Sequence, residues 1–153
     1  MGKLNSYAGV AYNDYLFAKS SLVTGDEVGN YNVTVSLAAQ SGEKYLKAVI
    51  EKCFVEDPDS MGLLHSHNLR AIYNKIITKY KLSISSRDCK WLGDFYFDAR
   101  YTGDDFVEVN KEDAEECLQI VEMLRQDVSL VLEEEEKQRF CAKESLRDLK
   151  AFQ

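Results

Sequence analysis

The sequence predicts an all-α fold, an antiparallel bundle of four to five helices. Apolar residues recur at spacings of three and four through most of the 153-residue chain, which is typical of helices with one buried face. No stretch is convincing as a strand, and short links rich in turn-forming residues separate the helical segments. We expect residues 1–132 to form the bundle as one domain and residues 133–153 to form a charged helical extension or tail.

The first helix is predicted from Ser6 to Val23, with Gly25 ending it in a connector rich in turn formers. The central helix follows, within an apolar run from Val33 to Phe54. Its predicted buried face contains Val35, Ala38, Ala39, Gly42, Leu46, Val49, Ile50 and Cys53. Its polar face contains Gln40, Glu43, Lys44, Lys47 and Glu51, and we expect this face to be solvated. Because Gly42 has no side chain, we expect a neighbouring helix to approach closely there.

Pro58 is the only proline and breaks the chain after the central helix. A third helix is predicted to begin at Ser66 or His67 and to run through Tyr80. A fourth helix follows the N-cap region 85–88 and ends at the turn 100–105.

Asn110 is predicted to cap a long final helix, with acidic residues in its first turn. Its predicted buried stripe contains Ala114, Cys117, Leu118, Val121, Leu124, Val128, Val131 and Leu132. Beyond it the sequence becomes strongly charged, beginning with the four glutamates 133–136. The pairs Glu133–Lys137 and Glu135–Arg139 would let the helix run on, either as a frayed extension or as a contact with a second chain.

Composition excludes several classes of protein. A net charge of −7 and a pI of about 4.9 argue against a general surface for DNA, and they make RNA an unexpected partner. The four cysteines are widely separated, with no CxxC pair, so we expect free thiols and neither a zinc site nor a redox pair. We expect a cytoplasmic protein, because the sequence shows neither an apolar run of membrane-spanning length nor a signal peptide.

Several segments, in order and spacing, resemble the HEPN (higher eukaryotes and prokaryotes nucleotide-binding) family. They are Tyr31-Asn32, the run 38–48 (AAQSGEKYLKA), His67-Asn68-Leu69, the run 96–104 (YFDARYTGD) and Glu112-Asp113-Ala114. The resemblance extends from about Tyr12 to Leu132. It implies a short helical bundle that dimerises and that is often encoded beside a minimal nucleotidyltransferase, as a toxin–antitoxin-like pair.

HEPN ribonucleases carry an Arg followed, four to six residues later, by a His. This sequence lacks that motif, because its only histidines, His65 and His67, both precede its first arginine, Arg70. A second departure is Thr102, where the related turn usually has proline after the Arg-Tyr pair. The resemblance therefore implies a HEPN-like domain without the family's ribonuclease centre, and we identify no catalytic residue.

Lys44 and Lys47 are three residues apart on the central helix, where two ammonium groups could meet one phosphate. The alternative is an exposed charged face in which Glu43 pairs with Lys47. His67, at a helix start, could donate to an anionic ligand or simply cap the helix. With only His65 near it, His67 has too few companions to form a metal site, and we expect neither a metal nor a cofactor.

Arg100 and Tyr101 close the fourth helix within the segment that resembles the family. Arg100 could fork onto a phosphate while Tyr101 stacks on a base, or Arg100 could form an ion pair with Asp104. No nucleophile–base arrangement and no glycine-rich phosphate loop is present.

The leading hypothesis is a non-catalytic, homodimeric HEPN-like domain that binds a nucleotide or a partner nucleotidyltransferase. Its predicted binding residues are Lys44, Lys47, His67, Arg100 and Tyr101. One alternative is a divergent ribonuclease that assembles His67 with Arg100. Another is a pure protein-interaction module, whose acidic surface and long last helix dock another chain.

Overall fold

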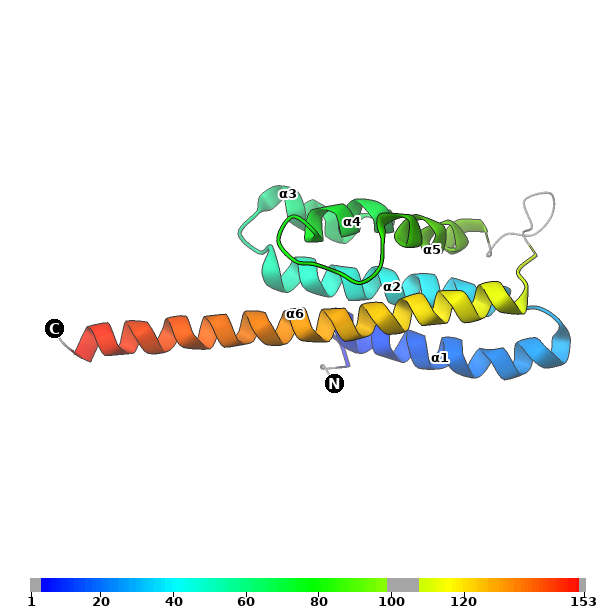
Figure 1. Cartoon of the computed structure of the whole chain (residues 1–153), viewed down its shortest axis with the longest axis horizontal. Coiled ribbons are helices and arrows are strands. Elements are labelled where there is room, and N and C mark those ends of the chain that lie inside the picture. Colours follow the sequence, from blue (N-terminus) through cyan, green and yellow to red (C-terminus); the bar gives the residue numbers. More distant parts are fainter. Residues whose placement is uncertain (1–3, 99–107, 152–153) are drawn as a thin grey trace.

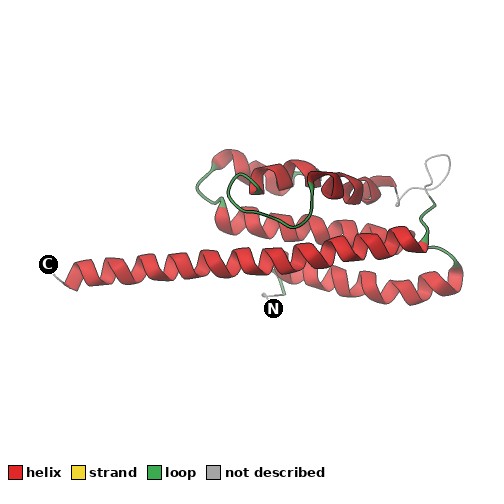
Figure 2. Ribbon diagram, in the orientation of Figure 1, coloured by secondary structure: helices red, strands yellow, loops and turns green. Residues whose placement is uncertain are grey.

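A computed structural model describes residues 4–98 and 108–151 of the chain. Its elements are α1 (Tyr7–Val28), α2 (Asn32–Cys53), α3 (Pro58–Met61), the 3₁₀ helix η1 (Gly62–His65), α4 (Leu69–Ile76), α5 (Ser86–Asp98) and α6 (Lys111–Ala151). All secondary structure in these two ranges is helical, as Figure 2 shows, which confirms the predicted all-α bundle.

The helix α2 lies at the centre of the bundle. It contacts α1 and α6 on one side and α4 and α5 on the other (Figure 1). Its fully buried side chains include Val35, Leu46, Val49 and Ile50. The predicted apolar face of the central helix is therefore confirmed as the middle of the hydrophobic core.

The prediction for Gly42 is also confirmed. Gly42 is buried, and a Cβ atom built on it would lie 2.8 Å from Cδ2 of Leu92 in α5. A side chain at position 42 would therefore displace a fully buried leucine. Because Gly42 has no side chain, α2 and α5 can pack closely enough for the Leu92 side chain to lie against position 42.

The prediction that Gly25 ends the first helix is wrong. The helix α1 continues to Val28 and ends at Gly29, which has the left-handed φ of 70° that glycine adopts readily. Gly25 is buried within α1, and a Cβ atom there would lie 2.6 Å from Cδ1 of Tyr31. This glycine makes room for an aromatic ring, which is a tertiary requirement that local turn signals do not reveal.

The predicted solvated face of the central helix is wrong at two positions. The side chains of Glu43 and Lys47 are only 6% and 5% exposed. Because neighbouring helices cover most of the circumference of α2, its polar face is narrower than the periodicity suggests. Lys44 is partly exposed, at 27%.

The segment after Pro58 contains two short helices, α3 and η1, that the sequence analysis missed. Asp57 caps α3 by accepting hydrogen bonds from the backbone N–H groups of Asp59 and Ser60, at 3.1 and 3.4 Å. The third predicted helix is shorter than expected, since α4 begins after the N-cap Asn68 and ends at Ile76 instead of Tyr80.

Both predicted N-caps of the later helices are confirmed. Ser85 Oγ accepts from the N–H of Asp88 at 3.1 Å, and the Asp88 carboxylate accepts from the N–H of Ser85 at 2.8 Å. This reciprocal pair is a capping box at the start of α5. Asn110 Oδ1 accepts from the N–H of Asp113 at 2.8 Å at the start of α6. The predicted turn 100–105 lies outside the described residues.

The helix α6 has two parts. Its first part buries Ala114, Cys117, Val121, Leu124, Val128 and Val131 against the bundle. Its second part runs past the other helices to the C-terminal end of the described chain (Figure 1). All side chains from 136 to 150 are exposed. The predicted charged extension at 133–153 is therefore helical as far as Ala151, and its division from the bundle as a separate unit stays a prediction.

Cys53, Cys89 and Cys117 are buried free thiols, and Cys141 is an exposed one. None of the described helices combines the length and the apolar character that a membrane-spanning segment needs.

An ion pair on α6 should make the stability of the fold decrease at acidic pH. Arg125 donates to Glu122 through Nη2 at 2.6 Å and through Nε at 2.8 Å, which lowers the pKa of the Glu122 carboxyl from 4.5 to about 2. Since the pKa is lower in the folded state, the pair stabilises the fold above pH 4.5, and this stabilisation is lost as the pH falls towards 2.

In urea unfolding between pH 2 and 6, Glu122→Gln should therefore lose less stability on acidification than the wild type. Both side chains are about one-third exposed, so we expect a difference of only about 1 kcal/mol. Identical pH dependences of the two proteins would contradict this assignment.

Candidate functional site

Four side chains from three parts of the chain meet beside α2 and form what we call the His67 cluster: Glu43, Lys47, His67 and Tyr96. His67 Nδ1 lies 2.9 Å from Glu43 Oε1, and Lys47 Nζ donates to Glu43 Oε2 at 3.3 Å. The rings of His67 and Tyr96 are stacked, with centroids 5.0 Å apart and planes inclined by 15°. One carboxylate thus bridges a lysine and a histidine, and an aromatic ring from α5 covers the histidine.

Burial differs sharply within the His67 cluster. Glu43 and Lys47 are almost completely buried, whereas the side chain of His67 is 50% exposed. A buried carboxylate and a buried ammonium are tolerated because each is the other's partner. Their charges cancel, so a protonated His67 would leave one positive charge at the surface of the cluster.

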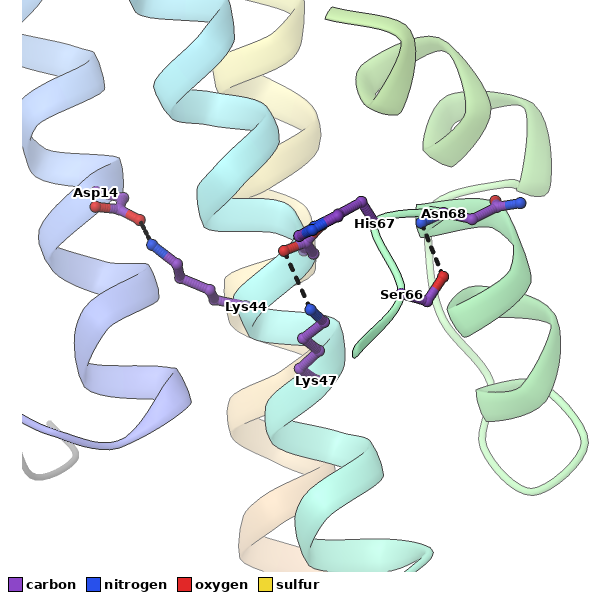
Figure 3. A network of polar contacts seen from close by, with 7 residues as sticks. Asp14, Lys44, Lys47, Ser66, His67 and Asn68 are labelled. Carbon is purple, nitrogen blue, oxygen red and sulfur yellow. Dashed lines mark hydrogen bonds and ion pairs between the residues drawn. The ribbon is translucent and has the colours of Figure 1, made fainter. Parts of the chain in front are cut away.

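Local structure fixes the position of His67. It lies in the link between η1 and α4, directly before the N-cap Asn68, whose side chain accepts from the N–H of Ala71 at 3.1 Å. Ser66 Oγ accepts from the N–H of Asn68 at 3.1 Å, as Figure 3 shows. The imidazole is therefore presented at the N-terminal end of α4, where the helix dipole favours negative charge.

This arrangement suits the binding of an anionic group. In the protonated imidazolium both ring nitrogens are donors, so Nδ1 can donate to Glu43 while Nε2 remains as the donor for a ligand. The Glu43 carboxylate and the stacked Tyr96 ring hold the imidazole in one orientation. Ligand binding therefore loses less conformational entropy at this side chain. Phosphate oxygens are acceptors of the kind that a fixed imidazole and a helix N-terminus can bind together.

Of the three predicted binding residues that the structure describes, it brings together Lys47 and His67 and connects them through Glu43. Lys44 lies elsewhere, since its ammonium group pairs with Asp14 on α1 (Figure 3). The two lysines are thus directed to different carboxylates, although they are three residues apart. Arg100 and Tyr101 lie outside the described residues, and their roles stay predictions.

Sequence reasoning missed two members of the His67 cluster. Glu43 was assigned to a solvated face, although its spacing of four from Lys47 correctly indicated their pairing. Tyr96 falls in the segment that resembles the HEPN family, but it was not given a role. No sequence signal connects it with His67, because the contact depends on how α5 lies against α2.

Metal binding has no support in the part of the chain that the structure describes. No group of three or more His, Cys, Asp or Glu side chains there is arranged to hold a metal ion.

Comparison with known proteins gives one match. The family model described as the HEPN domain matches residues 18–135, which include α2, the His67 cluster and the buried part of α6. No curated protein matches the chain, and no solved structure matches it.

Proposed function

Because the chain belongs to the HEPN domain family, we propose that it is a non-catalytic helical domain that binds a nucleotide at the His67 cluster. The observation that carries the proposal is the fixed, half-exposed His67, which is hydrogen-bonded to a buried carboxylate and stacked on Tyr96. In this proposal Nε2 of the protonated His67 ring donates to a phosphate oxygen at the N-terminal end of α4. The ring of Tyr96 beside it provides apolar surface for the rest of the ligand.

The proposal of a non-catalytic role rests on the sequence. A ribonuclease of this family needs an Arg followed within six residues by a His, and no such pair exists in the chain. Lys47 contributes to binding indirectly, since it neutralises Glu43 and thereby allows an anion to approach.

Thermal unfolding with a panel of nucleotides tests the proposal. A nucleotide present at a hundred times its dissociation constant should stabilise the fold by about 2.7 kcal/mol, which corresponds to a rise of roughly 5–10 °C in the midpoint. We expect His67→Ala to abolish this rise and His65→Ala, the matched control two residues away, to retain it. Lys44→Ala should also retain it, because Lys44 is paired with Asp14.

Absence of a shift with every nucleotide would contradict nucleotide binding. A shift that persists in His67→Ala would place the nucleotide elsewhere in the molecule and would contradict the proposed site.

A second candidate function is a divergent ribonuclease, and the Glu43–His67 hydrogen bond favours it. A carboxylate that orients an imidazole is the arrangement by which a general base is held for proton transfer. In this alternative Arg100 supplies the positively charged side chain of the ribonuclease site. It predicts RNA cleavage that is lost in His67→Ala and in Arg100→Ala, and a wild-type protein inert on several RNAs would eliminate it.

Family membership also supports the proposal that the domain acts with a minimal nucleotidyltransferase, in a toxin–antitoxin-like or stress-response system in the cytoplasm. Co-purification with a nucleotidyltransferase encoded beside it tests this part. A complex that survives both His67→Ala and Arg100→Ala would favour a pure protein-interaction role. Failure to form any complex would contradict the partnership.

A further inference from the structure

The end of α6 forms an arm, defined here as residues 140–151. Just before it, Arg139 ties α6 to the bundle by donating to the backbone carbonyl of Lys52. Within the arm, the side chains of Phe140 and Leu146 are 62% and 59% exposed. The arm therefore presents apolar and charged groups that the described part of the chain leaves uncovered.

One face of α6 carries an ordered pattern of charge along its second half. Its residues are Glu133, Glu136, Phe140, Lys143, Arg147 and Lys150. They follow one another at alternating spacings of three and four, which places them on one face of the helix, here called the stripe. The stripe is acidic before Phe140 and basic after it. Such a pattern is self-complementary when two copies of the helix run antiparallel.

The same face of α6 borders a groove in the bundle. The groove has a volume of about 770 Å³ and lies between the first turns of α1, the later turns of α2 and α6. Its lining includes Tyr7, Tyr12, Tyr45, Glu51, Arg125 and Glu133. The hydroxyl group of Tyr45 is buried there and hydrogen-bonds to no described residue. Beyond the groove, Phe140, Lys143, Arg147 and Lys150 line a smaller depression of about 470 Å³ on the arm.

We propose that the arm of a second copy of this chain packs antiparallel on this stripe, so that two chains exchange arms about a two-fold axis. With the axis between residues 141 and 142, Glu133 lies opposite Lys150 of the second copy and Glu136 lies opposite its Arg147. Every such pair occurs twice, which is the self-complementarity that a two-fold interface requires.

Charge identifies the second copy as the occupant. The arm is basic on its stripe, whereas the chain as a whole has a net charge of −7, so a complementary surface is present on every copy. A parallel arrangement would place the acidic segments against each other, which is unfavourable. At ~1.5 Å per residue, the paired region from 133 to 150 is about 25 Å long. The tip of each arm then lies beside the groove of the other chain.

Charge reversal in the 153-residue chain tests the proposal. One variant, Arg147→Glu with Lys150→Glu, makes the basic half acidic, and another, Glu133→Lys with Glu136→Lys, makes the acidic half basic. In sedimentation equilibrium, each variant alone should raise the dimer dissociation constant by roughly tenfold or more. The reason is that the pairs 133–150 and 136–147, each of which occurs twice, then bring together like charges. Mixed in equal amounts, the two variants should form a heterodimer of wild-type affinity.

A matched control reverses charge on another face of the same helix. Glu134→Lys with Asp148→Lys changes the net charge as much as the Glu133/Glu136 variant does, and it should leave the dissociation constant unchanged. Circular dichroism confirms that each variant is folded. The proposal is overturned if the wild type is monomeric, if the stripe variants dimerise like the wild type, or if mixing them does not restore association.

Discussion

Replacing Glu43 by leucine should lower the free energy of unfolding by about 3–5 kcal/mol, because it leaves the ammonium group of Lys47 buried without its partner. It also removes the acceptor of His67 Nδ1. Urea unfolding at neutral pH measures the loss. The magnitude follows from burial, since the Lys47 side chain is only 5% exposed and cannot easily reach water.

The double variant Glu43→Leu with Lys47→Met is the control for this prediction. It removes both charges together, and well-packed apolar replacements for a buried ion pair are often neutral or stabilising. We therefore expect the double variant to be more stable than Glu43→Leu alone. A loss below about 1 kcal/mol in Glu43→Leu, the range of exposed ion pairs, would show that Lys47 is solvated in the folded protein.

The second large effect is expected where α2 and α5 touch. Leu92 is fully buried against Gly42, so Leu92→Ala should lower the free energy of unfolding by about 2–5 kcal/mol through the cavity that it leaves. Gly42→Val should lower it by about 1–3 kcal/mol through overpacking, because its side chain would collide with Leu92. Chemical denaturation of both single variants and of the double variant measures these changes.

The double variant tests whether the two positions share one volume. In Gly42→Val with Leu92→Ala, the added side chain occupies space that the truncated leucine vacates, so the total loss should be smaller than the sum of the single losses. Simple additivity would contradict the direct contact between positions 42 and 92.

The apolar periodicity of α2 and α6 was sufficient to predict the bundle, because these long helices contribute most of the core. The capping residues Ser85 and Asn110 were predictable for a different reason, since a cap depends on residues within one turn. The turn-forming residues around Gly25 wrongly indicated a helix end there. Gly25 instead lies within α1 and makes room for the ring of Tyr31. Local signals also missed α3, which is too short to show a period.

The candidate site was only partly predictable. The sequence identified Lys47 and His67 and the pairing of Glu43 with Lys47, all of which depend on helical spacing or on a helix start. It did not reveal that Glu43 also contacts His67, or that Tyr96 stacks on that ring. Both contacts join residues far apart in the chain, and they exist because α4 and α5 pack against α2.

Nuclear magnetic resonance of the two histidine rings tests the central claim most directly. The ¹⁵N and ¹H signals of His67 and His65 would be followed while a nucleotide that raises the unfolding midpoint is titrated into the 153-residue chain. Ligand binding at the His67 cluster predicts that the ring signals of His67 shift and saturate with the ligand, while those of His65 stay nearly constant. Saturable binding that leaves the His67 ring signals unchanged would contradict the proposed site.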